Sequence, residues 1–197
     1  SLLPERYHLE VAVSAERYAQ ALRRVGRDEE MVFVLLVSAI ERLSSEQTLV
    51  DDPLSDLDME SVIRTDDLSE EQVDELRSLF RNRKAKARFI SFVQEYGSGF
   101  LDGEAREPTH TQVTPDNLDR VMGAIYDARS GYLHSGDPMY LSHSYAMHAG
   151  WHMDASVGQY RQNRRFSANQ KLPHVEFFHR LVRYCILRRI DALTATT

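Results

Sequence analysis

An arginine and a histidine close together in one segment are the residues of this chain best suited to chemistry. Arg129 and His134 lie in "IYDARSGYLHSG", residues 125 to 136. A histidine has a reference pKa of about 6.5, so it can take a proton from a ribose 2′-hydroxyl or return one to a leaving oxygen. An arginine beside it can hold a phosphate and stabilise the charge that builds on its oxygens. Together the two side chains would be sufficient for metal-independent RNA cleavage that leaves a 2′,3′-cyclic phosphate.

The spacing of the pair carries no weight by itself. The chain contains eight His and 21 Arg, so an Arg followed at this distance by a His is expected by chance. The alternative interpretation is a solvated pair at the end of a helix, where a protonated His interacts favourably with the helix dipole. The surrounding sequence therefore has to distinguish a site from a surface pair.

A helix is expected to position Arg129 and His134. Thr114 and Pro115 form a start signal, a cap followed by Pro at the first helical position. Gly131 and Gly136 weaken continuation and place the pair near the helix end. Arg129 and His134 are expected at the edge of the buried face, because His134 shares a stripe with Tyr126 and Ser130 beside the apolar residues. Those apolar residues are Leu118, Val121, Met122, Ile125 and Ala128.

The remaining apolar spacing predicts four more helices, over residues 5–25, 28–44, about 70–96 and from 173 onward. Ser69 and Gln72 are placed for a capping box at the start of the third. "GSGFLDG", residues 97 to 103, is expected to break that helix. No strand-like alternation stands out. The fold class is therefore predicted as all-α, one bundle of about five helices over residues 1–197.

Two long segments fall outside these helices. Residues 51–68 are predicted as an acidic, loop-like excursion; between Asp51 and Glu75 the chain has eleven acidic residues and one basic residue, Arg64. Residues 135–172 are predicted as a long irregular insertion before the last helix. Loops of this length are usually functional or disordered. The acidic segment could fold back over an Arg-rich edge as a built-in inhibitor, or dock on a basic helix face.

Two short segments resemble motifs of the HEPN superfamily (higher eukaryote and prokaryote nucleotide-binding), particularly its Apea-like branch. One is a helix ending in Tyr–x–x–Arg–Ser followed by a His and a Gly, here Tyr126, Arg129, Ser130, His134 and Gly136. The other is "VLLVSAIERLSS", which is similar to the "ALE-x-L" helix of that branch. Ala39, Glu41 and Leu43 match it, and Ile40 is a conservative departure.

The resemblance implies an all-α bundle that is frequently dimeric. Many members are endoribonucleases whose two Arg–His pairs meet across the dimer axis, and others are non-catalytic. It implies Arg129 as the phosphate ligand and His134 as the general base or acid. Ser130 stands where the best-known nuclease members have Asn; its hydroxyl can still donate a hydrogen bond.

Three residues near the pair have open assignments. Glu41 either orients Arg129 from the neighbouring helix, or pairs elsewhere or faces solvent. Ser130 and Tyr126 are candidate phosphate or base contacts; the alternative for Tyr126 is ordinary packing at the edge of the core.

Two further basic segments could contact RNA. "RNRKAKAR", residues 81 to 88, contains Arg81, Arg83 and Lys84, and a solvated helix face is the alternative. "RQNRR", residues 161 to 165, contains Arg161, Arg164 and Arg165 and lies in the irregular insertion. The net charge of −6 does not exclude an RNA partner, since the acidic residues are concentrated between Asp51 and Glu75.

No metal or other cofactor is expected. His143, His148, His152 and Asp154 offer ligand types for zinc, but their spacing matches no zinc motif and a packed lid is the better interpretation. The single cysteine, Cys185, is predicted as a packed structural thiol, which points to a reducing compartment and a cytoplasmic location. No run of apolar residues reaches the length of a membrane helix.

The sequence therefore predicts a metal-independent endoribonuclease of the defence or toxin type. Its partners would be RNA and a second copy of the chain, with an antitoxin, a regulatory partner or further domains of a longer chain as other possibilities. The alternative is a non-catalytic module that binds a nucleotide or RNA, or that dimerises, within a larger protein.

Overall fold

The computed structural model describes residues 3–45, 69–103, 113–139, 160–161, 164–165 and 172–195. The acidic excursion at 51–68 and most of the 135–172 insertion lie outside the described residues. The long elements are α1 (His8–Leu22), α2 (Glu29–Leu43), α4 (Glu70–Gly103), α5 (Leu118–Ser135) and α6 (Val175–Ala195). Short 3-10 helices, η1 (Glu5–Tyr7) and η2 (Pro115–Asn117), lead into α1 and α5. The predicted all-α bundle is confirmed.

One small sheet departs from the sequence expectation of no strands. β1 (Tyr160–Arg161) and β2 (Arg164–Arg165) pair antiparallel inside the segment that was predicted to be irregular. Each strand has two residues, too few to show the alternation of apolar and polar residues by which strands are recognised in a sequence.

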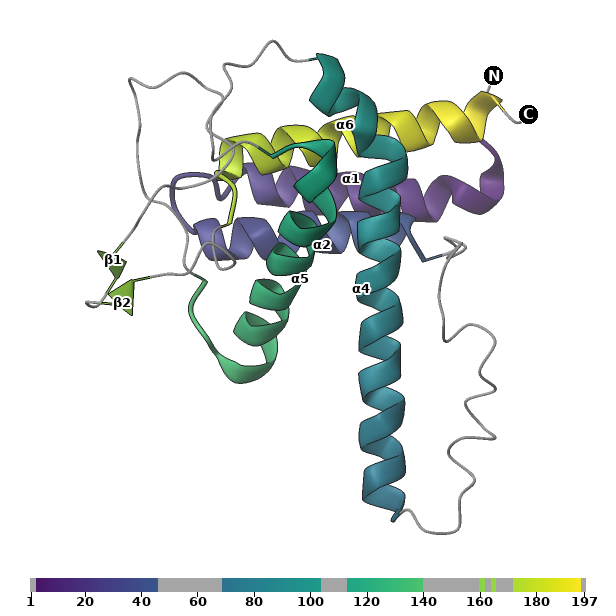
Figure 1. Cartoon of the computed structure of the whole chain (residues 1–197). Helices are drawn as coiled ribbons and strands as arrows, with labels where there is room; N and C mark the ends of the chain where they lie inside the picture. Colours follow the sequence, from purple (N-terminus) through teal and green to yellow (C-terminus); the bar gives the residue numbers. More distant parts are fainter. Residues whose placement is uncertain are drawn as a thin grey trace.

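The helices form two crossing layers (Figure 1). α1, α2 and α6 run side by side in one layer, and α4 and α5 cross over it. α2 lies at the centre because it is apolar on nearly every side. Phe33 of α2 stacks on Phe178 of α6, with ring centroids 5.1 Å apart. The buried residues of α2 are Val32, Phe33, Val34, Leu36, Val37, Ala39, Ile40 and Leu43.

The helix boundaries follow the local signals of the sequence. Ser69 and Gln72 form the predicted capping box: the Gln72 N–H donates to Ser69 Oγ at 3.3 Å, and the Ser69 N–H donates to Gln72 Oε1 at 2.9 Å. Gly26 after α1 and Gly136 after α5 both have positive φ, 76° and 69°, which L-residues with a side chain rarely adopt.

The expectation that residues 97 to 103 break a helix is wrong, since α4 runs unbroken to Gly103. Each glycine costs a helix about 1 kcal/mol relative to Ala, but here glycines let α6 approach closely. A Cβ on Gly97 would lie 3.1 Å from Leu181 Cδ1, and one on Gly99 would lie 2.7 Å from the Tyr184 hydroxyl oxygen. Tertiary packing therefore outweighs the local helix-breaking signal.

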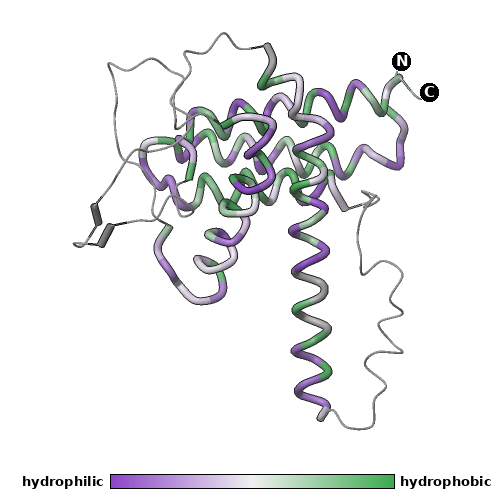
Figure 2. The backbone as a smooth tube through the Cα atoms, viewed as in Figure 1, coloured by the Kyte–Doolittle hydropathy of each residue, from purple (hydrophilic) through white to green (hydrophobic). Residues whose placement is uncertain are grey.

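The first half of α4 extends past the other described helices (Figure 1). We call residues 70–84 the α4 arm. Figure 2 shows its described residues as mostly hydrophilic, with isolated apolar ones. The arm also corrects one expectation about charge. Residues 70–75, the last part of the acidic segment, belong to the same continuous helix as the basic run at 81–88, so they cannot fold back onto it.

None of the helices that the structure describes combines the length and apolar character that a membrane span requires.

Candidate functional site

α5 positions the Arg–His pair and ends where the sequence predicts. η2 leads into the helix, and the Thr114 N–H donates to Asn117 Oδ1 at 2.9 Å. At the other end, Gly136 takes the left-handed conformation and the Asp137 N–H donates to the Gly131 carbonyl at 3.2 Å. This cap stops the helix directly after the turn that carries His134.

Arg129 is held by a carboxylate from α2. Its Nη2 donates to Glu41 Oε2 at 2.8 Å, and the side chains of Arg129 and Glu41 are 17% and 23% exposed. Of the alternatives for Glu41, pairing with Arg129 is therefore the one that the structure shows. The Arg129 Nε is buried and has no hydrogen-bond partner among the described residues. The guanidinium is thus held through Nη2, while its buried Nε is an unsatisfied donor.

Tyr126 completes this contact from the core side. Its hydroxyl donates to the second carboxylate oxygen, Glu41 Oε1, at 2.9 Å. Its ring lies 5.6 Å from the Phe89 ring and 5.7 Å from the Arg129 guanidinium carbon. Burial, followed by the Glu41 carboxylate, raises the pKa of Tyr126, so the phenol stays protonated and remains a donor.

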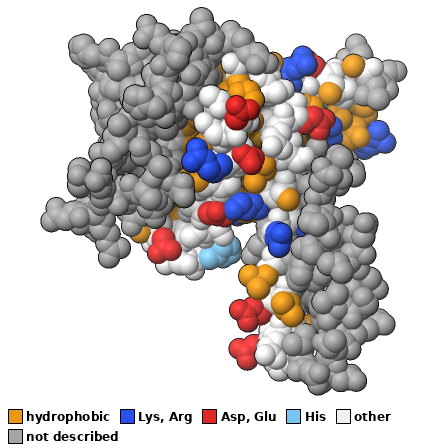
Figure 3. All heavy atoms as spheres, viewed as in Figure 1, with side chains coloured by type: hydrophobic (Ala, Val, Ile, Leu, Met, Phe, Trp, Pro, Cys, Tyr) orange, Lys and Arg blue, Asp and Glu red, His pale blue; other side chains and the backbone are white. Residues whose placement is uncertain are grey.

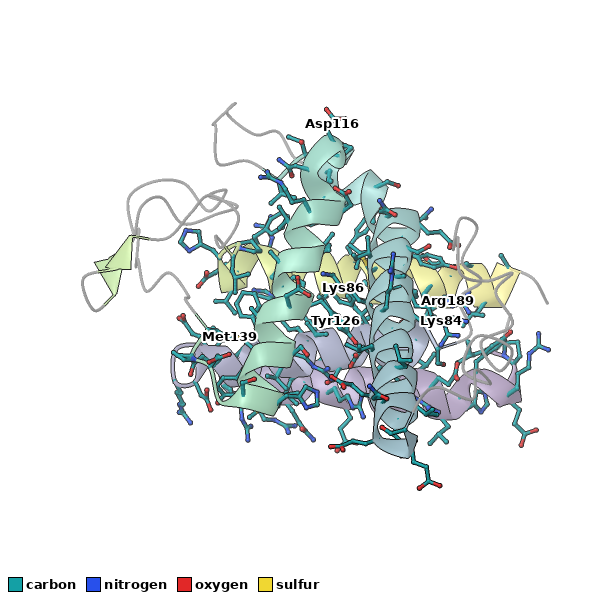
Figure 4. The ribbon with its side chains drawn as sticks, turned by 60° about the horizontal axis from the view of Figure 1, so that its bottom comes forward. Lys84, Lys86, Asp116, Tyr126, Met139 and Arg189 are labelled. Carbon is teal, nitrogen blue, oxygen red and sulfur yellow. The ribbon has the colours of Figure 1, made fainter. Side chains whose placement is uncertain are left out.

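Tyr126 therefore lies at the edge of the core with its hydroxyl directed at Glu41. Figure 4 shows it between α4 and α5. The stripe on which Tyr126 lies passes from the core to the surface: Tyr126 is buried, Ser130 is half-buried and His134 is exposed. Five residues turn a helix by about 140°, so the Arg129 and His134 side chains leave α5 in different directions.

A contact that the sequence did not indicate anchors the chain after α5. The backbone N–H of Met139 donates to Glu30 Oε1 at 2.8 Å, and the Met139 side chain is buried. Glu30 lies in the first turn of α2. No sequence signal joins these residues, which are 109 positions apart.

The basic run on α4 does not gather at Arg129. Lys86 donates to both carboxylate oxygens of Asp127 on α5, each at 2.7 Å, and so ties the two helices together. Figure 4 shows Lys86 on the side of α4 that faces α5 and Lys84 on the other side. Arg83 is exposed, and the Arg81 side chain lies outside the description. On the face shown in Figure 3, basic and acidic side chains are interspersed.

Other candidates fall partly outside the described residues. The side chains of Arg161, Arg164 and Arg165 are not described, and neither are the His143, His148, His152 and Asp154 residues considered for zinc. In the part of the chain that is described, no three His, Cys, Asp or Glu residues are grouped to hold a metal ion.

Cys185 is a packed thiol, as expected. It is fully buried, and burial raises the pKa of its thiol to about 12. A Cβ on Gly97 would lie 3.2 Å from its Sγ, so the thiol is part of the contact between α4 and α6.

Comparison of the chain with protein-family models, curated proteins and solved structures gave no match. Membership of the HEPN superfamily therefore stays a prediction from two short segments. The contact between them, from Glu41 to Arg129, is the structural observation that bears on it.

Proposed function

We propose that the chain is a HEPN-type, metal-independent endoribonuclease that acts as a homodimer. The observation that supports this most is the contact of Glu41 with Arg129, 88 residues later in the chain. The two segments that resemble HEPN motifs lie far apart in the sequence, yet their charged residues meet at 2.8 Å. A guanidinium held in this way is preorganised to stabilise charge on a phosphate.

His134, Arg129 and Glu41 have separate roles in this reaction. His134 takes the proton from the ribose 2′-hydroxyl, and the 2′-oxygen attacks the phosphorus. The bond from phosphorus to the 5′-oxygen breaks, the leaving oxygen takes a proton from water, and a 2′,3′-cyclic phosphate remains. Glu41 engages one nitrogen of Arg129, so other guanidinium N–H donors are left for the phosphoryl oxygens.

A second copy of the chain would let an arginine and a histidine reach the same phosphate. Because Arg129 and His134 point away from α5 in different directions, one chain does not aim both at the same phosphate. Two chains related by a two-fold axis can supply the histidine and the arginine from opposite sides. In prokaryotes such domains are typical of toxins and anti-phage defence, so host or phage RNA is the proposed substrate and an antitoxin a fitting regulator.

The test is cleavage of mixed-sequence RNA in EDTA by the wild type, Arg129→Ala and His134→Ala. Arg120→Ala and His8→Ala are matched controls, since both residues are exposed and neither is a partner in the Glu41 contact. We expect cyclic-phosphate ends from the wild type and both controls, and a loss of about 100-fold or more in the two site variants. The same RNA with 2′-O-methyl groups should stay intact. Cleavage that survives both site substitutions would exclude this site.

A non-catalytic module, which binds RNA or only dimerises, is the second candidate, and the burial of Arg129 against Glu41 favours the form that only dimerises. The side chain is only 17% exposed and its charge already faces Glu41. A binding module would retain RNA in EDTA without cutting it, and Arg129→Ala would weaken that binding while His134→Ala would not.

A further inference from the structure

The α4 arm is a helix without a neighbouring helix in the described structure. Helices of about 12 to 15 residues are marginally stable in water without packing partners, and Figure 1 shows no other described helix alongside the arm. Leu79, near its middle, is 58% exposed and has the second-highest exposure among the large apolar side chains of the described residues. The arm therefore presents apolar surface that a partner could cover.

The exposed charges around Leu79 form a simple pattern. Glu75 lies four residues before Leu79 and Arg83 four residues after it, so all three share one helix face. Further toward the start of the arm Glu70 and Glu71 are exposed and acidic, and after Arg83 comes the half-buried Lys84. Eight residues of helix span about 12 Å, so Glu75 and Arg83 of one chain cannot pair with each other.

We propose that the α4 arm docks against the α4 arm of a second copy, antiparallel, with a two-fold axis passing near Leu79. The two Leu79 side chains then meet at the axis. Glu75 of each chain faces Arg83 of the other chain, so the pattern is complementary to itself. A parallel pair would instead place Glu75 against Glu75 and Arg83 against Arg83, which like charges disfavour.

The strength of this contact follows from its composition. Exposed ion pairs contribute little and are screened by salt, and the apolar contact centres on one leucine from each chain. The pair of arms is therefore a weak, salt-sensitive interface in which the charges set the orientation. It stands on the arm alone, whether or not Arg129 and His134 cleave RNA.

Sedimentation velocity on the full chain at several concentrations and at low and high salt tests the interface. We expect the wild type to associate through the arms at low salt, and Glu75→Arg and Arg83→Glu each to raise the dissociation constant of that contact about tenfold or more. The E75R/R83E double variant, and a mixture of the two single variants, should regain association because both restore opposite charges. Arg23→Glu, an exposed charge reversal in the turn after α1, is the matched control. Circular dichroism checks that α4 stays helical.

A wild-type monomer, or a dimer that neither single substitution weakens, would overturn the proposal. The second of these results would mean that the copies associate through another surface, such as the end of α5. It would leave the ribonuclease proposal intact.

Disulfide cross-linking tests the antiparallel register. Leu79→Cys should link to itself across the axis, and Glu75→Cys should link to Arg83→Cys when the two are mixed. Cys185 does not interfere, since it is buried and its thiol pKa is raised. Efficient linking of Glu75→Cys to itself, with none to Arg83→Cys, would show a parallel pair and contradict the proposal.

Discussion

The two halves of α4 are one continuous helix in opposite surroundings. The half from Lys86 to Gly103 crosses α5 and α6; Phe89, Phe92 and Val93 are fully buried there, and Lys86 is paired with Asp127. The arm carries exposed Leu79 and exposed charges. Helix formation is therefore compatible with both surroundings, and the difference lies in what each half contributes. The packed half contributes buried contacts to the bundle, whereas no other described helix lies beside the arm.

The largest effect on the free energy of unfolding should follow from truncating a buried side chain in the packed half of α4. Phe92 is fully buried with its ring 4.8 Å from that of Tyr96. Phe92→Ala should lower the free energy of unfolding by about 3–5 kcal/mol, through lost burial and a residual cavity. Urea unfolding followed by circular dichroism measures it. A loss below about 1 kcal/mol would mean that this half is not the stabilising one.

Crowding the contact between α4 and α6 should cost less. Gly97→Val adds branches where even a Cβ lies 3.1 Å from Leu181 Cδ1, and overpacking of this kind costs about 1–3 kcal/mol. Gly97→Ala is the control: its gain in helix propensity opposes a smaller clash. The same experiment should give Gly97→Val a lower free energy of unfolding than Gly97→Ala. The reverse order would show that α4 and α6 separate easily.

Removing a charge in the bundle should lower the free energy of unfolding more than removing one on the arm. Glu41→Gln removes the charge that faces Arg129 and should cost about 1–2 kcal/mol, because a mostly buried guanidinium loses its charged partner. Glu75→Gln on the arm should change the free energy of unfolding by no more than about 0.5 kcal/mol at concentrations where the chain is monomeric. Equal effects of the two changes would remove this distinction between bundle and arm.

The smallest effect on stability is expected at Leu79. Leu79→Ala should alter the unfolding free energy of the monomer by about 0.5 kcal/mol or less, because the side chain is 58% exposed. Its effect should appear in the dissociation constant of the dimer. Unfolding measured at two protein concentrations separates these contributions, and a large loss at the lower concentration would show that the arm is packed within the monomer.

The sequence predicts those features of the fold that depend on neighbouring residues. Ser69 with Gln72, Thr114 with Pro115, and Gly136 mark helix ends through local hydrogen bonds and backbone preferences. The prediction failed at residues 97 to 103 because the stabilising contact comes from α6, about 80 residues later. Local propensity contains no information on that approach.

The candidate site divides in the same way. The position of Arg129 and His134 near a helix end could be predicted, since it follows from the course of α5 alone. Which of the alternatives held for Glu41, and the direction of the Tyr126 hydroxyl, could not, because both depend on how α2 crosses α5. The link from Met139 to Glu30 had no sequence signal at all.

α2 holds the segment from Arg129 to Met139 at both of its ends. Glu41, near the end of α2, accepts a hydrogen bond from Arg129. Glu30, in the first turn of α2, accepts one from the backbone of Met139, just beyond His134. The two carboxylates are eleven residues apart, about 16 Å along the helix axis. α2 therefore holds this segment at two separate points. A rigid tilt of α2 against α5 would move Arg129 and the turn that bears His134 together. A ligand that immobilised α2 would therefore immobilise both.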